Sequence, residues 1–315
     1  MIRFPKSSPI RLVLFDAFDT LVTPRSAPHL QYASIARQYG FNISDEDVKS
    51  AFKHAFRTTS KEHPNYGLET DIASPDEWWE LVIRRTFSPE RHSGISVEHY
   101  DTSIGDLSQR LVTRFGTSEA YDVFPDVVPT LSQLTQTNTS DGKPILLTLA
   151  TNSDSRILSV LKSFGLDQYL ELDVDTEPDS DAPHRPKRGP TLSYFEKCAK
   201  PDKRFFHAAF QRAAKTTSFA ASSHLCTSLS VETHPIGLAN VLYVGDQLHE
   251  DFWGAIDAGV QAAWLQRPTN FESNQPYQQI GQYRSSPEEQ RYVRERTITN
   301  LGDVINIVTN SHEIP

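Results

Sequence analysis

The stretch Arg11-Leu-Val-Leu-Phe15-Asp16-Ala17-Phe18-Asp19-Thr20-Leu21 decides the fold, and its first half predicts a buried strand. Four of the five residues from Arg11 to Phe15 are apolar, without the alternation of a half-buried strand, and the run stops at Asp16. Continuous apolar runs are typical of parallel strands that are covered on both faces. Similar runs recur at residues 145–150, 241–244 and 262–265. The sequence therefore predicts a buried parallel sheet.

Helical patterns follow two of these runs. After Thr151-Asn152-Ser153-Asp154, apolar residues recur at helical spacing and the pattern stops at Gly165, a residue type that commonly ends helices. A second helical pattern lies between Gly245-Asp246 and Gly259. Strands that alternate with helices predict an α/β fold with a doubly wound sheet.

A long excursion separates the first two apolar runs. From residue 24 to residue 119 the chain shows mostly helical spacing of its apolar residues. We therefore assign residues 1–23 and 121–315 to an α/β core, and residues 24–120 to a helical cap domain inserted after the first strand. The cap is expected over the carboxyl end of the sheet, where such sheets bind their ligands.

Three polar segments interrupt the predicted core. Residues 173–190 hold several prolines and alternating charges, residues 214–235 are rich in Ser, Thr and Ala, and residues 268–290 are polar with many Gln. We expect all three to be flexible surface loops.

Composition excludes several classes of protein. The 315 residues include 31 Lys+Arg and 40 Asp+Glu, a formal charge of −9, which argues against nucleic acid as a partner. The sequence contains no run of 18 apolar residues, so it predicts no membrane span. Cys198 and Cys226 are the only cysteines, and residues 1–11 do not read as a secretory signal. We expect a cytoplasmic or nuclear protein that is not secreted; the sequence identifies no protein partner.

Four polar segments carry the candidate chemistry. Asp16 ends the first predicted strand, Thr151-Asn152 follows the second, Lys200-Pro201-Asp202 comes later, and Asp246 with Asp251 follows another strand. Each is weak alone, since such residues are common as helix caps, surface lysines or turns. Together they place a carboxylate, a hydroxyl, an ammonium and a carboxylate pair at the carboxyl ends of parallel strands.

The order of these segments resembles the four motifs of the haloacid dehalogenase-like (HAD) hydrolase superfamily. Within the insertion, Pro64-Asn-Tyr-Gly-Leu68 and Trp78-Trp79 resemble the eukaryotic subfamily called HAD-like hydrolase domain-containing protein three. The resemblance covers most of residues 10–267. It implies a Rossmann-like core, with a parallel sheet and helices on both faces, and an inserted helical cap.

The resemblance also implies a mechanism, Mg²⁺-dependent hydrolysis of a small phosphorylated metabolite. Asp16 would attack phosphorus and form an aspartyl phosphate. Mg²⁺ would be held by Asp16, the backbone carbonyl of Phe18 and Asp246. Lys200 would neutralise the developing charge.

Two further roles follow from the same resemblance. Thr151 and the backbone amides at Asn152 would hold phosphate oxygens near a helix N-terminus. Asp251 would support the metal site or Lys200 from behind.

Phe18 departs from the pattern of the phosphatases in this superfamily. They have an aspartate two residues after the nucleophile, which protonates the leaving group and then activates water. A phenyl ring transfers no proton, and a positioned acid or base is worth about 10²–10⁴ in rate. We therefore expect slow hydrolysis of ordinary phosphate esters, unless Asp19 or a cap residue substitutes.

Two alternatives stay open because of Phe18. One is a non-catalytic or vestigial module that binds a phosphorylated ligand or a protein partner. The other is metal-independent dehalogenation of 2-halo acids, since enzymes of that kind have an aromatic residue at this position. Those enzymes lack the pair that Asp246 and Asp251 supply, so the metal-dependent phosphatase is the preferred interpretation.

Trp78 and Trp79 are adjacent on a predicted helix and point about 100° apart. At most one of them is expected to face a cleft. We interpret both as packing residues of the helical domain rather than as platforms for a substrate.

Overall fold

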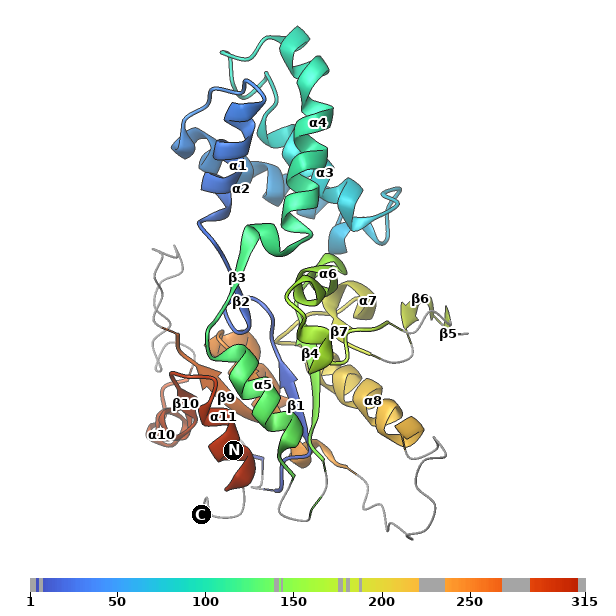
Figure 1. Cartoon of the computed structure of the whole chain (residues 1–315), viewed down its shortest axis with the longest axis vertical. Coiled ribbons are helices and arrows are strands. Elements are labelled where there is room, and N and C mark those ends of the chain that lie inside the picture. Colours follow the sequence, from blue (N-terminus) through green and yellow to red (C-terminus); the bar gives the residue numbers. More distant parts are fainter. Residues whose placement is uncertain are drawn as a thin grey trace. The chain divides into compact units, whose positions relative to one another are not determined.

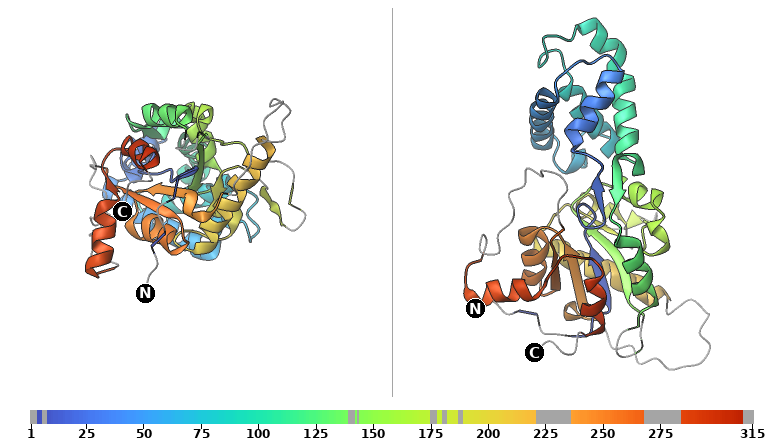
Figure 2. Two further views of the ribbon diagram at one scale, coloured as in Figure 1. Left: turned by 90° about the horizontal axis from the view of Figure 1, so that it is seen from below. Right: turned by 60° about the vertical axis from the view of Figure 1, so that its left-hand side comes forward.

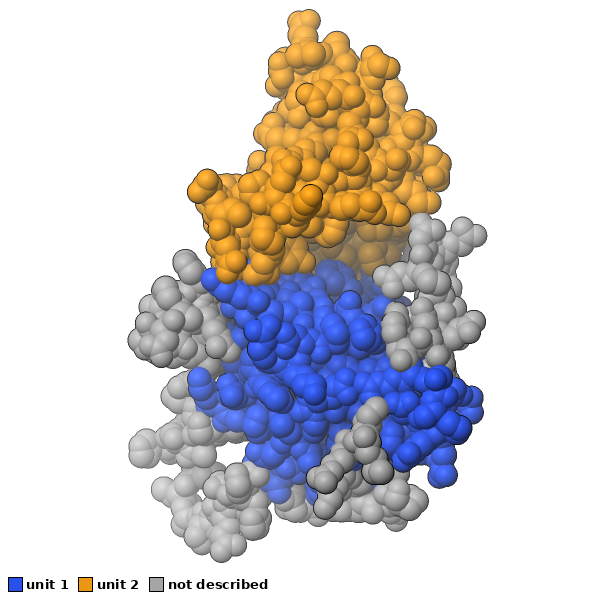
Figure 3. Space-filling view, turned by 180° about the vertical axis from the view of Figure 1, so that it is seen from behind, with its two compact units in different colours: residues 1–23, 123–153, 165–315 blue, residues 24–122, 154–164 orange. Residues whose placement is uncertain are grey.

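The computed structural model describes most of the chain (Figures 1 and 2). The described residues are 4–5, 8–138, 142, 144–174, 178–179, 182–186, 189–220, 236–267 and 284–310. The chain divides into two compact units, an α/β unit of residues 1–23, 123–153 and 165–315, and a helical unit of residues 24–122 and 154–164 (Figure 3). Residues 154–164 thus group with the helical unit, although the sequence analysis assigns them to the core.

The α/β unit is built on a parallel sheet with the strand order β10-β9-β8-β1-β4-β7. Within the described residues its strand pairs run parallel, and β1, β8 and β9 are buried along their whole length. The four strands predicted from apolar runs are confirmed. The strands are β1 (Leu12–Phe15), β4 (Leu146–Thr151), β7 (Thr191–Leu192), β8 (Val241–Gly245), β9 (Gln261–Leu265) and β10 (Thr297–Ile298).

Helices cover both faces of this sheet, as predicted. Leu14 of β1 and Tyr243 of β8 share a buried cluster with Phe205 and Phe206 of α8 and with Ile256 of α9. Both views show α5 and α11 on the opposite face (Figures 1 and 2). The helices include α5 (Val127–Gln136), α7 (Ser193–Glu196), α8 (Lys203–Ala220), a π-helical turn (Leu248–Trp253), α9 (Gly254–Asp257), α10 (Pro287–Glu295) and α11 (Asp303–Thr309).

The helical unit confirms the helical prediction for residues 24–119. Ser44, Ser74 and Ser96 each cap a helix by accepting a hydrogen bond from a backbone N–H in its first turn. The short paired strands β2 (Val22–Pro24) and β3 (Tyr121–Val123) carry the chain out of the α/β unit and back. The helices are α1 (Pro28–Gln38), α2 (Asp45–Glu62), α3 (Pro75–Thr86), α4 (Val97–Phe115) and α6 (Arg156–Ser163). No helix among the described residues is long and apolar enough to cross a bilayer.

The three predicted loops are wrong in part. The helix α8 runs to Ala220 and so includes the first residues of 214–235, a stretch where alanines favour helix. The helix α10 begins inside 268–290 with a reciprocal capping box between Ser286 and Glu289. Within 173–190, β5 (Pro178–Asp179) and β6 (Ala182–Pro186) pair as an antiparallel hairpin. Residues 175–177, 180–181, 187–188, 221–235 and 268–283 of the predicted loops lie outside the described residues.

Candidate active site

Three neighbouring strands end at one edge of the sheet and bring the predicted side chains together. Phe15 of β1 is in register with Leu149 of β4 and with Val244 of β8. Asp16 follows directly, and its backbone N–H donates to the carbonyl of Val244 at 2.9 Å. Because parallel strands share a direction, Asp16, Thr151 and Asp246 emerge at the same edge. This convergence is what the sequence pattern predicts.

The carboxylates of Asp16, Asp246 and Asp251 form a cluster in which one oxygen of each lies within 4.8 Å of the others. Asp16 and Asp251 are buried and Asp246 is half-buried. Burial, together with the charges of Asp251 and Asp16, raises the pKa of Asp246 well above its ordinary value. The cluster therefore holds more negative charge than its surroundings neutralise, and its oxygens are the ligands that a hard divalent cation prefers.

Lys200 supplies the positive charge at this cluster. Its ammonium group lies 2.9 Å from Asp16 Oδ1 and 2.6 Å from Asp251 Oδ1, and it donates to the Tyr243 hydroxyl at 2.8 Å. Two of its N–H donors bond Asp251 and Tyr243, and the contact with Asp16 is an ion pair. Lys200 is only 5% exposed. Burial alone would lower the pKa of Lys200, but the charges of Asp16 and Asp251 outweigh it and raise that pKa.

Tyr243 and Asn152 hold Lys200 in place. The hydroxyl of Tyr243 accepts from the Lys200 ammonium and donates to the carbonyl of Ala150 at 2.7 Å. The Asn152 side chain accepts from the Lys200 backbone N–H at 2.8 Å and donates to the Lys200 carbonyl at 3.1 Å. It also donates to Glu250 Oε2 at 3.2 Å. These bonds add a role for Asn152 beyond its predicted backbone contact with phosphate.

The sequence analysis misses Tyr243 altogether. The available signal is that this residue is the one aromatic in the otherwise aliphatic strand β8. A polar aromatic at a buried strand position needs a partner for its hydroxyl, which marks it as a residue worth placing. The predicted support for Lys200 or the metal from Asp251 corresponds to two contacts, with the Lys200 ammonium and with the Gln247 backbone N–H at 2.8 Å.

The turn after Asp16 has an aspartate, Asp19, at a position whose backbone conformation favours glycine. Asp19 has a φ of +54°, the left-handed region where glycine is unstrained and most side chains are not. The turn is held by the Asp19 N–H, which donates to Val22 O at 2.7 Å, and by the Thr23 hydroxyl, which donates to Asp19 Oδ1 at 2.8 Å. Aspartate tolerates this backbone because its short side chain bonds locally. Phe18, immediately before it, is half-buried.

The two adjacent tryptophans have different surroundings within the helical unit. Trp78 is 2% exposed, and its indole N–H donates to the carbonyl of His63 at 2.8 Å. Trp79 is half-buried, and its indole N–H donates to Asp154 Oδ2 at 2.9 Å. The packing role predicted for Trp78 is confirmed, whereas Trp79 also makes a specific polar contact.

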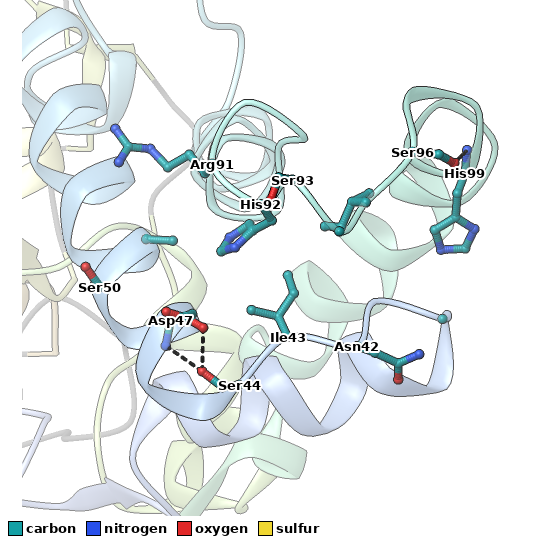
Figure 4. Close-up of a pocket in the computed structure, with 14 residues that line it drawn as sticks. Asn42, Ile43, Ser44, Asp47, Ser50, Arg91, His92, Ser93, Ser96 and His99 are labelled. Atoms are coloured by element: carbon teal, nitrogen blue, oxygen red, sulfur yellow. Dashed lines mark hydrogen bonds between the residues drawn. The ribbon is translucent and has the colours of Figure 1, made fainter.

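The helical unit also contains a cavity of about 640 Å³, bordered by the first turn of α2 and the segment that leads into α4 (Figure 4). His92 points into this space, and Ser44 and Asp47 bond to each other at its edge (Figure 4). The lining residues include none of the predicted site residues. The cavity and the carboxylate cluster therefore have no residue in common.

A sequence model of the haloacid dehalogenase-like hydrolases matches residues 10–259. The chain therefore belongs to this family of hydrolases, as its motifs predict. Haloacid dehalogenase-like hydrolase domain-containing protein 3 from Mus musculus is 27% identical over 241 residues, which is 76% of this chain and 83% of that protein. The resemblance to this subfamily is thus confirmed at the level of sequence.

Solved structures with the same fold include a dehalogenase and a putative hydrolase that is bound to magnesium. The defluorinating L-2-haloacid dehalogenase Rha0230 is similar with a TM-score of 0.56 and 15% identity, over 98% of this chain and 99% of that chain. The putative HAD-hydrolase YfnB from Bacillus subtilis, bound to magnesium, is similar with a TM-score of 0.50 and 16% identity, over 96% and 99%. Identities this low show the shared fold alone.

Proposed function

We propose that the protein is a Mg²⁺-dependent phosphatase that hydrolyses a small phosphorylated metabolite through an aspartyl phosphate on Asp16. One observation carries the proposal: the carboxylates of Asp16, Asp246 and Asp251 form one cluster, and the ammonium of Lys200 pairs with two of them, Asp16 and Asp251. A lone lysine leaves excess negative charge in this cluster. When the Asp16 carboxylate attacks a phosphate ester, two anions approach each other, so part of their negative charge must be neutralised. A divalent cation can neutralise it.

The residues present fit such a cation. Three carboxylates within 4.8 Å of one another offer hard oxygen ligands, and burial with the neighbouring charges of Asp251 and Asp16 raises the pKa of Asp246, as expected where carboxylates crowd together. Asp16, the carbonyl of Phe18 and Asp246 would hold Mg²⁺, with Asp251 behind them. When bound, Mg²⁺ would neutralise charge on the phosphoryl oxygens and leave Asp16 free to attack.

The side chains divide the reaction into two steps. In the first, a carboxylate oxygen of Asp16 bonds to phosphorus, the ester P–O bond breaks, and the alcohol leaves with a proton from solvent. Lys200 stabilises the charge on the phosphoryl group, and the Thr151 hydroxyl bonds one of its oxygens. In the second, water attacks phosphorus, the Asp16–phosphorus bond breaks, and phosphate leaves.

Phe18 is the specific observation that favours a second candidate, dehalogenation of 2-halo acids. There Asp16 would attack carbon rather than phosphorus and displace halide, with no proton needed by the leaving group. A third outcome is a module that binds a phosphorylated ligand without turning it over. Cytoplasmic or nuclear location stays a prediction in each case.

One experiment separates these functions. We expect the purified chain to release 4-nitrophenol from 4-nitrophenyl phosphate with Mg²⁺ and not with EDTA, and to release no chloride from 2-chloropropionate. Asp16→Asn should abolish turnover, because an amide is a poor nucleophile. The control Glu295→Gln changes an exposed carboxylate that pairs with Arg291 and should keep activity. Metal-independent chloride release would replace the proposal with dehalogenation, and phosphate binding without turnover would replace it with the binding module.

A further inference from the structure

The chain passes from the α/β unit to the helical unit between Ser153 and Asp154. This junction lies immediately after Thr151 and Asn152, the residues proposed to hold the phosphoryl group. Three residues of one turn therefore belong to the unit with the nucleophile, and the next residue belongs to the other unit. The connection is a single peptide bond.

Asp154 is firmly held on its own side of the junction. Its side chain is buried, with the residue 3% exposed, and its carboxylate accepts from the Trp79 indole N–H at 2.9 Å. The same carboxylate accepts from the backbone N–H of Arg156 at 2.8 Å and from its guanidinium at 3.1 and 3.2 Å. The guanidinium also lies 4.8 Å from the centre of the Trp79 ring. Trp79 thus fastens residues 154–164 to the helical unit.

The preceding residues are held just as firmly to the α/β unit. The side chain of Asn152 bonds the backbone N–H and carbonyl of Lys200. The carbonyl of Ser153 accepts from the backbone N–H of Tyr194 at 3.3 Å. Because the residues on both sides of the junction are hydrogen-bonded, a displacement of Asp154 should also shift the backbone of the residues that precede it.

We infer that Trp79 is a positioning residue, whose bond to Asp154 anchors the residue that follows the Thr151–Ser153 turn and so fixes the geometry of that turn. The inference rests on the proposed function and deepens it, because it makes Trp79 a determinant of phosphoryl alignment. Catalytic groups tolerate displacements of only a fraction of an ångström. Release of Asp154 should therefore reduce kcat more than it changes KM.

The chain provides a matched control in the adjacent tryptophan. Trp79→Phe removes one indole N–H and keeps an aromatic ring beside Arg156. Trp78→Phe removes an equivalent N–H whose bond, to His63, does not involve the residues that follow Thr151. We expect kcat on 4-nitrophenyl phosphate at saturating Mg²⁺ to fall about 10-fold in Trp79→Phe and less than twofold in Trp78→Phe.

A double-mutant cycle tests whether Trp79 acts through Thr151. In a Thr151→Ala background, Trp79→Phe should reduce kcat by less than the 10-fold expected in the wild type, because the Thr151 hydroxyl that the turn positions is gone while the Asn152 amide remains. A full 10-fold loss in that background would overturn the inference, since it would mean that Trp79 acts elsewhere.

Hydrogen exchange supplies a readout that does not depend on activity. Exchange of the amides of residues 151–153 should be at least threefold faster in Trp79→Phe than in the wild type, and unchanged in Trp78→Phe. Unchanged exchange in Trp79→Phe overturns the inference, whatever the activity. Faster exchange in a chain without phosphatase turnover would support the mechanical link and reject the proposed function alone.

Discussion

Replacing Arg267 with methionine should destabilise the α/β unit strongly. The guanidinium donates to the carbonyl of Thr20 at 2.8 and 3.2 Å and to Asp126 Oδ2 at 3.0 Å, and it lies 3.8 Å from the centre of the Phe124 ring. It thereby connects the turn after the nucleophile with the segment that follows β3. Methionine keeps most of the aliphatic bulk and removes the charge and all the donors.

The expected loss in the free energy of unfolding follows from the partners that Asp126 and the Thr20 carbonyl keep in the variant. Removing one partner of a buried ion pair costs about 3–5 kcal/mol. The Asp126 side chain is 14% exposed and still accepts a hydrogen bond from the backbone N–H of Leu301 at 2.8 Å. The loss of its ion pair with Arg267 should therefore cost only about 2 kcal/mol. The carbonyl of Thr20 loses both of its Arg267 donors, which adds about 1 kcal/mol. We expect a loss of about 3 kcal/mol at pH 7, measured by urea unfolding.

The effect should depend on pH with a definite sign. Burial alone would raise the pKa of Asp126, but the Arg267 hydrogen bonds, the Leu301 N–H and the charge of Arg267 outweigh it and lower that pKa. The stability contributed by the pair is thus fully present above the unfolded value of about 3.9 and is lost as pH falls through the folded pKa. The difference between wild type and Arg267→Met should shrink below about pH 4.

A control variant makes the test decisive. Arg204→Met removes an exposed arginine that pairs with Asp202, with 78% of the arginine side chain in solvent. It should leave the unfolding midpoint unchanged, because exposed pairs contribute little. Equal losses in the two variants, or a difference for Arg267→Met that persists undiminished to pH 3, would refute the reasoning.

Three more predictions concern the site. Tyr243→Phe should cost about 1–3 kcal/mol in urea unfolding, because the carbonyl of Ala150 and the ammonium of Lys200 each lose a buried partner; a loss below about 0.5 kcal/mol would mean that water replaces the hydroxyl. Asp246→Asn should weaken Mg²⁺ binding at least 10-fold by calorimetry yet raise the metal-free melting temperature at pH 7, because it removes the charge that Asp251 and Asp16 oppose; a lower melting temperature would contradict this. Phe18→Asp should accelerate hydrolysis of alkyl phosphates about 10–10³-fold and of aryl phosphates less, judged by kcat/KM, and an equal gain would argue against a missing acid.

The sequence predicts the central strands well because their signal is local. An uninterrupted apolar run such as residues 12–15 has few structural alternatives, and parallel strands necessarily present their ends at one edge. The convergence of Asp16, Thr151 and Asp246 follows from that geometry without knowledge of any contact.

Other features could not be predicted because their cause is distant in sequence. The bond between Asn152 and Lys200 joins residues 48 positions apart, and β7 has only two residues, too few for any periodicity. The end of α8 and the start of α10 were hidden by polar composition, which masks helix propensity and a capping box alike. The grouping of residues 154–164 with the helical unit is accompanied by contacts that no sequence pattern reveals, such as those of Trp79 with Asp154 and of Ser118 with Ser163.

That grouping bears on how this protein can be taken apart. A chimaera that exchanges residues 24–122 for the insertion of a relative would look like a clean transplant. It would nevertheless leave Asp154 without its hydrogen-bond donor Trp79. It would also remove Ser118, whose N–H donates to the Ser163 hydroxyl at 2.8 Å. The smallest transplantable module is therefore two segments, 24–122 and 154–164, exchanged together.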